Sequence, residues 1–141
     1  MKKTASAHWE GDLKQGKGTI STQSGALKNN PYGFNTRFED TPGTNPEELI
    51  GAAHAGCFSM AFAMLLGEEK LTPDSIDTKA TVTLEKKSDG FTVTAVQLDM
   101  RARIPGINQA KFDEIAGKAK VGCPISKLLN AEITLNATLE N

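Results

Sequence analysis

The sequence contains little cysteine, few aromatic residues and almost no net charge. Its 141 residues include two cysteines, one tryptophan and one tyrosine, and 16 basic residues nearly balance 17 acidic ones, so the net charge is −1. Two cysteines are too few for a secreted scaffold held by disulfides. The near-neutral charge excludes the electrostatic footprint of a nucleic-acid-binding protein. No run of like charge is long enough to indicate a polybasic membrane patch.

The sequence also lacks internal repeats, low-complexity segments, domain linkers and a secretory signal. Residues 1–10 carry two lysines with no apolar stretch behind them, which argues against a signal peptide and favours the reducing cytoplasm. We therefore expect a single domain spanning residues 1–141. A chain of this length can bury a hydrophobic core without disulfides.

Only one long apolar run interrupts the polar sequence, at residues 49–67. It is nearly as long as a membrane-spanning helix, but about half of its positions are Gly, Ala or Ser, and it contains His54. A spanning helix is usually more hydrophobic. When the rest of the chain is polar, a helix that is apolar on all of its sides is better explained as the buried helix of a protein core. We therefore expect no membrane insertion.

Hydrophobic patterns and turn signals predict an α+β domain. Asn45 followed by proline and two glutamates is a strong helix start, and a Ser-Asp-Gly turn predicts a hairpin between two long strands. The predicted elements, in chain order, are strands 7–10, 18–22 and 34–39, a helix from 45 to 67 or 69, strands 76–86 and 91–104, helices from 108 to about 121 and from 124 to about 130, and a strand at 131–139.

The two cysteines stand in contrasting settings. Cys57 lies in the apolar run about three turns past the helix start, where the helix dipole has faded and apolar burial raises the pKa of a thiol. Cys123 lies between Gly122 and Pro124, where one helix should end and another begin, and free backbone N–H groups favour a thiolate there. Two such thiols suggest one that reacts and one that resolves the product. The alternative is a non-catalytic binding or structural module with inert core cysteines.

A reactive Cys57 needs a cation from elsewhere in the chain. Arg37, between two phenylalanines, is the candidate, although it could also be an ordinary surface arginine. Glu48 either holds this arginine through a bidentate pair or is only a carboxylate in a helix's first turn. Glu48 and Cys57 are nine residues apart, so they face opposite sides of the helix about 13 Å apart along its axis. An antiparallel partner helix that crosses near Ala52 and Ala53 would bring both into one shared site.

Other chemistries have weaker support. His54 lies one turn before Cys57, but both side chains point outward and no oxyanion-hole motif accompanies them, so a satisfied core histidine is favoured over a cysteine hydrolase. His8, His54 and the cysteines lack the spacing of zinc ligands. The glycines form no phosphate-binding pattern. We therefore expect neither a metal nor a cofactor.

Three segments resemble one known family. They are PYGFNTRF at residues 31–38, GTNPEELIGAAHAGCFSM at 43–60 and AKVGCPIS at 119–126. The chain resembles the OsmC family of thiol-dependent peroxidases, which is related to the organic hydroperoxide resistance (Ohr) proteins, and the resemblance is closer to the OsmC branch and covers essentially the whole chain. Gly56 is a local difference, because alanine is expected there.

The resemblance implies a fold and a set of roles. Cys57 would be the peroxidatic cysteine, Cys123 the resolving cysteine, and Arg37, held by Glu48, the cation that supports the thiolate. The implied fold is an intertwined homodimer in which antiparallel sheets wrap a long buried helix from each subunit. The implied substrates are organic hydroperoxides and, less well, hydrogen peroxide. An external dithiol, of lipoyl type in the Ohr relatives, would reduce the resulting disulfide.

Overall fold

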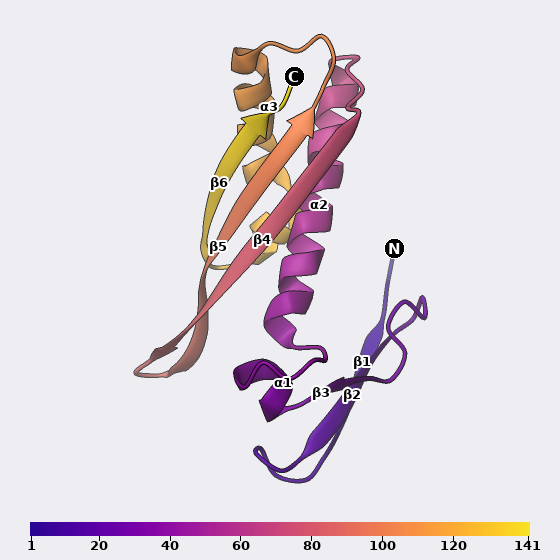
Figure 1. Cartoon of the computed structure of the whole chain (residues 1–141), viewed down its shortest axis with the longest axis vertical. Coiled ribbons are helices and arrows are strands. Elements are labelled where there is room, and N and C mark those ends of the chain that lie inside the picture. Colours follow the sequence, from indigo (N-terminus) through magenta and orange to yellow (C-terminus); the bar gives the residue numbers. More distant parts are fainter. The chain divides into compact units, whose positions relative to one another are not determined.

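The computed structural model describes residues 1–141 and divides into two compact units, residues 1–49 and 50–141. The elements of the first unit are β1 (Ala5–Glu10), β2 (Lys17–Thr22), β3 (Asn30–Tyr32) and α1 (Phe34–Phe38). Helix α2 (Pro46–Glu68) begins at the end of the first unit and continues into the second. The second unit adds β4 (Ser75–Lys87), β5 (Gly90–Arg103), α3 (Gln109–Gly122), α4 (Pro124–Leu128) and β6 (Glu132–Leu139) (Figure 1). The predicted α+β class is confirmed.

The first unit is built on an antiparallel sheet with the order β1-β2-β3. Trp9 of β1 and Tyr32 of β3 contact each other across β2, with ring centroids 5.4 Å apart. Gly18 lies between these rings on β2, where an added Cβ would collide with the Tyr32 ring and with the carbonyl oxygen of His8. The absence of a side chain at Gly18 therefore lets the two aromatic rings meet over the sheet.

The strand predicted at 34–39 is wrong, because the structure has helix α1 there. Thr36 provides the local reason: its Oγ1 accepts a hydrogen bond from the N–H of Gly33 at 2.9 Å, which satisfies a backbone donor at the helix start. Phe34 and Phe38 pack with their ring centroids 5.0 Å apart. Their spacing of four residues fits one face of a helix as well as one face of a strand.

The second unit has a three-stranded sheet with the order β4-β5-β6. Strands β4 and β5 form the predicted antiparallel hairpin, with a bulge at Thr83 and Leu84. Strand β6 pairs with β5 in parallel, so the expectation of purely antiparallel sheets is wrong for this pair. The cause is the connection: α3 and α4 lie between β5 and β6 in the chain, and a helical crossover returns the chain in the same direction.

The hydrophobic core of the second unit lies between this sheet and helices α2 and α3. Phe62 of α2 meets Phe112 of α3 edge to face, with ring centroids 5.8 Å apart. Partly buried and exposed residues alternate along β4, in the predicted pattern. The buried hydrophobic residues are Phe58, Phe62, Leu66, Val96, Leu98, Met100, Ala102, Ile104, Phe112, Ile115, Ala116, Ala119 and Cys123.

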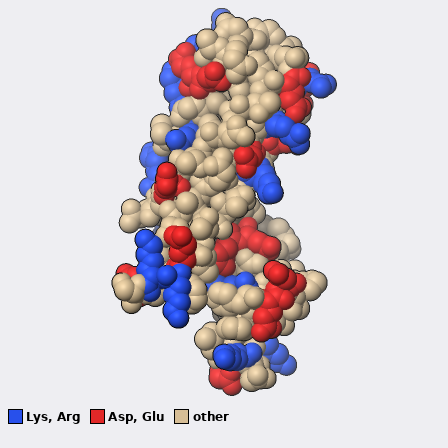
Figure 2. Space-filling model, turned by 60° about the vertical axis from the view of Figure 1, so that its left-hand side comes forward, with Lys and Arg blue, Asp and Glu red and all other residues tan.

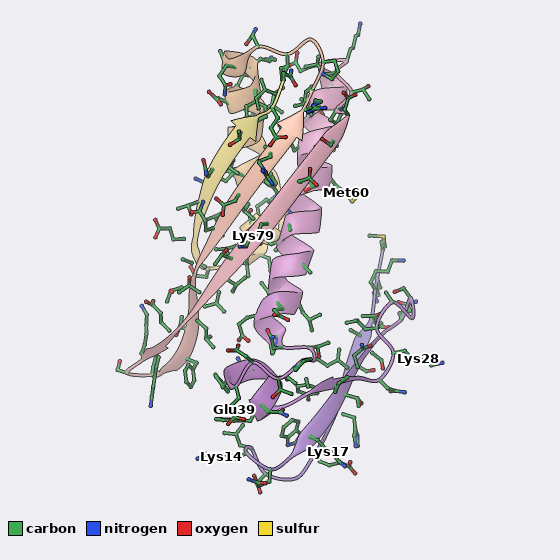
Figure 3. The ribbon with its side chains drawn as sticks, viewed as in Figure 1. Lys14, Lys17, Lys28, Glu39, Met60 and Lys79 are labelled. Atoms are coloured by element: carbon green, nitrogen blue, oxygen red, sulfur yellow. The ribbon has the colours of Figure 1, made fainter.

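Helix α2 is buried on one side only within the single chain. Its length and apolar composition would allow a membrane span. Only 28% of its most apolar window is buried within the single chain, so most of this apolar segment is uncovered there. Met60 and Met64 are 76% and 61% exposed, and Figure 3 shows Met60 projecting from the side of α2 away from β5 and β6. We call the exposed positions of α2 between Ala52 and Met64 its open face. They are Ala52, Ala53, Gly56, Met60 and Met64.

Charged side chains of both signs are interspersed on the surface shown in Figure 2. The structure also contains surface ion pairs: Lys111 of α3 pairs with Glu69 at 2.9 Å, and Lys118 pairs with Glu114 at 2.8 Å. Exposed pairs of this kind contribute little to stability, because water and salt screen them. This face therefore carries no large patch of one sign.

Candidate thiol site

The structure brings the two predicted cysteines together in the second unit. Cys57 is half-buried on α2 and packs against the core, and Cys123 is fully buried at the junction of α3 and α4. Both are free thiols. The Cys57 thiol lies near enough to the Cys123 thiol and to the backbone N–H of Ile125 for both to affect its pKa.

Local signals in the sequence put Cys123 at this junction. Asn108 caps α3, because its side chain accepts a hydrogen bond from the N–H of Lys111 at 2.8 Å. The N–H of Cys123 closes the last turn of α3 on the carbonyl oxygen of Ala119 at 3.0 Å. Pro124 then starts α4, a position where its missing N–H costs nothing. The change of direction between the helices leaves the Cys123 side chain in the core.

The surroundings of Cys57 within the chain disfavour its thiolate. Burial raises the pKa of the Cys57 thiol, and the neighbouring Cys123 thiol raises it further, while the N–H of Ile125 acts in the opposite direction. Burial has the largest effect, because a charged sulfur loses its hydration there. This agrees with the sequence argument that a reactive Cys57 needs a cation from outside its own helix.

His54 lies one helical turn before Cys57 and is fully buried. Its Nε2 lies 2.7 Å from Oγ of Ser126 on α4, whereas its Nδ1 has no hydrogen-bond partner. Burial lowers the pKa of His54, which favours the neutral imidazole. The expected core histidine is thus satisfied at one nitrogen only. Sequence reasoning missed Ser126, although it lies three residues after Cys123 in the same motif.

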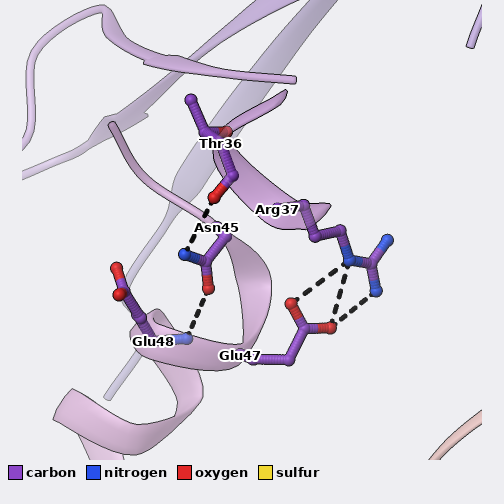
Figure 4. A network of polar contacts seen from close by, with 5 residues as sticks. All are labelled: Thr36, Arg37, Asn45, Glu47 and Glu48. Carbon is purple, nitrogen blue, oxygen red and sulfur yellow. Dashed lines mark hydrogen bonds and ion pairs between the residues drawn. The ribbon is translucent and has the colours of Figure 1, made fainter. Parts of the chain in front are cut away.

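Arg37 forms a bidentate ion pair with Glu47 in the first unit (Figure 4). Its Nη2 lies 2.6 Å from Oε1 of Glu47, and its Nε lies 3.2 Å from both carboxylate oxygens. The arginine side chain is 36% exposed and the glutamate 16%. The predicted partner was Glu48, so within the chain the pairing is corrected to Glu47.

Glu48 contributes its backbone rather than its carboxylate. Its N–H donates to Oδ1 of Asn45 at 2.8 Å, which confirms Asn45 as the cap of α2. The Glu48 side chain is exposed and makes no ion pair within the chain. Neighbouring residues on a helix differ by about 100° around its axis, and the sequence pattern did not show which of the two glutamates turns toward Arg37.

A small pocket lies beside Arg37 in the first unit and was not foreseen from the sequence. Its volume is about 210 Å³. Its aromatic residues come from β1 and from the adjacent elements β3 and α1, and the fold brings β1 beside the other two. The lining residues are Trp9, Leu13, Tyr32, Gly33, Phe34, Arg37, Phe38, Thr44 and Pro46.

The chemistry available to the second unit is that of a dithiol. Two thiols in contact can lose two hydrogens to an oxidant and form a disulfide. No group of three or more His, Cys, Asp or Glu side chains is arranged to hold a metal ion. Fold and site thus define a protein of the α+β class with two neighbouring free thiols.

Comparisons with known sequences agree with this class. The family described as OsmC-like protein matches residues 38–138. Peroxiredoxin OsmC of Escherichia coli strain K12 is 58% identical over 139 residues, which are 99% of this chain and 97% of that protein. An organic hydroperoxide resistance protein of Xanthomonas axonopodis pv. citri is 30% identical over 69% of this chain and 67% of that protein. The chain belongs to the OsmC-like family.

Solved structures share the fold at low sequence identity. An OsmC-like protein of unknown function from Vibrio cholerae matches with a TM-score of 0.78 at 18% identity, over 97% of this chain and 99% of that one. The organic hydroperoxide resistance protein OhrB of Bacillus subtilis matches with a TM-score of 0.68 at 24% identity, over 97% and 98% of the two chains. These likenesses establish the OsmC/Ohr fold.

Proposed function

We propose that the protein is a thiol-dependent peroxidase that reduces organic hydroperoxides and, less well, hydrogen peroxide by a two-cysteine cycle. The peroxidase class follows from its relatives, which are named as a peroxiredoxin and as organic hydroperoxide resistance proteins. The observation that carries the two-cysteine cycle is the proximity of Cys57 to Cys123: Cys57 packs against the core cluster that contains Cys123, and the Cys123 thiol affects its pKa. A sulfenic acid at Cys57 would form beside the thiol that consumes it.

In the proposed first step, the thiolate of Cys57 attacks one peroxide oxygen and the O–O bond breaks. The sulfur becomes a sulfenic acid, and the other oxygen leaves with a proton as an alcohol or water. In the second step, the Cys123 sulfur displaces the hydroxyl of the sulfenic acid, so that a disulfide forms and water leaves. An external dithiol, which we expect to be of lipoyl type, then reduces the disulfide by thiol exchange.

We assign the supporting cation to Arg37 and its positioning to Glu47. The raised pKa of Cys57 means that its thiolate needs a positive charge. The Glu47 carboxylate holds Nε and Nη2 of Arg37, which leaves Nη1 for the thiolate or the peroxide. Glu48, the residue assigned from the sequence, is the competing candidate for this positioning role.

We further propose that two chains form an intertwined homodimer with shared sites. Glu47 and Cys57 are ten residues apart on α2, or about 15 Å along an ideal helix, so an arginine held by Glu47 would serve the Cys57 of the partner chain. The open face of α2 consists of small and apolar residues. A second α2 packed against it would remove this apolar surface from water.

The preference for organic substrates has two sources in the chain. Cys57 packs against an apolar core, and Arg37 borders the pocket of about 210 Å³ with its aromatic walls. An alkyl or aromatic group gains free energy by entering such surroundings, whereas hydrogen peroxide has no apolar part to bury. We place the protein in the cytoplasm, where thiols are kept reduced.

Mass spectrometry of the intact protein tests the reaction directly. After one equivalent of cumene hydroperoxide, the native protein should lose about two mass units, the two hydrogens released on disulfide formation. Cys123→Ser should instead gain about one oxygen, and Cys57→Ser should remain unmodified. A native protein that keeps its mass, or a Cys57→Ser variant that still consumes peroxide, would refute the proposal.

An inert pair of core cysteines is the alternative that the raised pKa of Cys57 also allows. Alkylation by iodoacetamide across pH 5 to 10 separates the two readings. A catalytic Cys57 in the assembled protein should react as a thiolate well below the ordinary pKa of a cysteine. An inert Cys57 should react slowly and only at alkaline pH.

A further inference from the structure

Two side-chain contacts join α2 to the segment that carries Cys123. Cys57 interacts with Cys123, and His54 bonds to Ser126 with 2.7 Å between Nε2 and Oγ. His54 lies three residues before Cys57, and Ser126 lies three residues after Cys123. The two segments therefore run antiparallel, and the two contacts between them lie about one helical turn apart on each segment.

We propose that His54 and Ser126 are a positioning pair that holds α4 against α2 and so keeps Cys123 within reach of the oxidised Cys57. The pair acts on the resolving step, through α4, and not on the attack on peroxide. This inference rests on the two-cysteine reaction proposed above.

Helix α4 has few other means of staying in place. It is five residues long and contains no fully buried residue, and Leu128 at its end is 74% exposed. A helix this short is unstable by itself in water. The bond from Ser126 to His54 is the only hydrogen bond that an α4 side chain makes to another element. Its loss would leave α4 held by the partly buried Ile125 and by the backbone.

The burial of His54 supports a specific role for this contact. The ring is fully buried, yet Nδ1 has no hydrogen-bond partner, and leaving a buried polar atom unpaired is destabilising. A leucine at this position would avoid that penalty. The imidazole instead provides, from a long and well-packed helix, one hydrogen bond to the short helix next to the resolving cysteine.

The test measures the two chemical steps separately. Cys57 oxidation is followed by stopped flow with cumene hydroperoxide. Disulfide formation is followed by quenching samples in dimedone and measuring the mass of the intact protein by mass spectrometry. In Ser126→Ala, the rate of disulfide formation should fall about five- to tenfold, the factor expected from the loss of one hydrogen bond. The second-order rate of Cys57 oxidation should stay unchanged, and sulfinic acid at Cys57 should accumulate at excess peroxide.

Ser59→Ala is the matched control for Ser126→Ala. Ser59 lies on α2, as His54 does. Its hydroxyl donates to the carbonyl oxygen of Ala55 and bonds to Thr78 of β4, each at 2.8 Å, and makes no hydrogen bond to α4. Its loss should lower overall stability by a similar amount while the rate of disulfide formation stays unchanged. An equal slowing in Ser59→Ala and Ser126→Ala would mean that general loosening of the fold is responsible, and would overturn the inference.

Conservative variants and hydrogen exchange complete the test. Ser126→Thr keeps the hydroxyl, and His54→Gln keeps a polar group near the position of Nε2, so both should restore most of the rate that Ser126→Ala and His54→Leu lose. Amide exchange at residues 125–129 of the reduced protein should speed up in Ser126→Ala and not in Ser59→Ala.

The outcome separates this inference from the proposed function. If the native protein forms its disulfide and Ser126→Ala does so equally fast, the positioning role is wrong and the two-cysteine reaction stands. If the native protein forms no disulfide at all, the proposed reaction itself fails. If Ser126→Ala forms its disulfide slowly while amide exchange at residues 125–129 is unchanged, α4 is not released and the inference is again overturned.

Discussion

At the residue scale, the charge that supports Cys57 is open to direct measurement. Arg37→Met removes the guanidinium without removing any core residue, because Arg37 is partly exposed. Its loss should raise the pKa of Cys57 in the assembled protein and so slow peroxide attack about tenfold at neutral pH. Arg37→Lys should recover only part of the rate, because lysine cannot form the bidentate pair. The measurement is the pH dependence of kcat/KM, and a profile of Arg37→Met that overlays the native one would remove Arg37 from the site.

The two glutamates of α2 form a matched pair of variants. Glu47→Gln should slow peroxide attack, because it releases Arg37 from its carboxylate partner. Glu48→Gln should leave the rate unchanged, although each variant removes one carboxylate from the first turn and costs a few tenths of a kcal/mol of helix stability. Kinetics under identical conditions decide between them. The reverse result would restore Glu48 as the positioning residue.

His54 should make stability depend on pH on the acid side. Burial lowers its pKa in the folded chain, so between the unfolded and folded pKa values the unfolded state binds a proton that the folded state does not. The free energy of unfolding therefore falls as the pH drops below the ordinary histidine value of about 6.5. His54→Gln should lose this part of the dependence. Urea unfolding from pH 8 to pH 5 measures both proteins, and identical slopes would show that His54 does not carry the effect.

At the element scale, α3 depends on the cap at its first turn. Asn108→Ala removes the hydrogen bond to the N–H of Lys111 and should lower the free energy of unfolding by about 1 kcal/mol. Asn108→Ser keeps an equivalent acceptor and should cost much less. Urea unfolding of both variants measures the difference, and equal losses would show that the cap itself is not responsible. Because α3 leads directly to Cys123, disulfide formation is a second readout.

At the scale of the whole molecule, the open face of α2 predicts self-association. Gly56 lies on this face, and a Cβ added there meets nothing within 4 Å in its own chain. Gly56→Leu should therefore fold as a single chain but separate two packed helices, and sedimentation should detect a monomer. Gly67→Leu is the control, because Gly67 also has open space around it but lies near the end of α2. A dimer that persists in Gly56→Leu would place the interface elsewhere.

Shared sites make a further prediction at this scale. Arg37→Met and Cys57→Ser should both be weakly active or inactive alone. After subunit exchange, a mixed dimer would contain one site with an intact Cys57 from the first chain and an intact Arg37 from the second, so activity should return. Peroxide consumption before and after mixing is the measurement. A mixture as inactive as its parents would show that each site is built within one chain.

Most of the fold follows from local patterns in the sequence. Asn45, Asn108 and Pro124 determine where three helices begin, because capping and proline geometry act within one turn. Alternating residues determine β4 and β5, since one face of the sheet must be buried. The two cysteines and the residues around them were likewise sufficient to suggest the dithiol site and the family.

Tertiary structure decided what depends on rotation about an axis or on contacts between distant segments. Phe34, Thr36 and Phe38 fit either a strand or a helix, and only the hydrogen bonds around Thr36 select α1. Glu47 and Glu48 are chemically identical, and about 100° of helical rotation selects Glu47 for Arg37. Ser126 is 72 residues from His54, so no periodicity connects them; the packing of α2 against the end of α3 brings them together beside the two thiols.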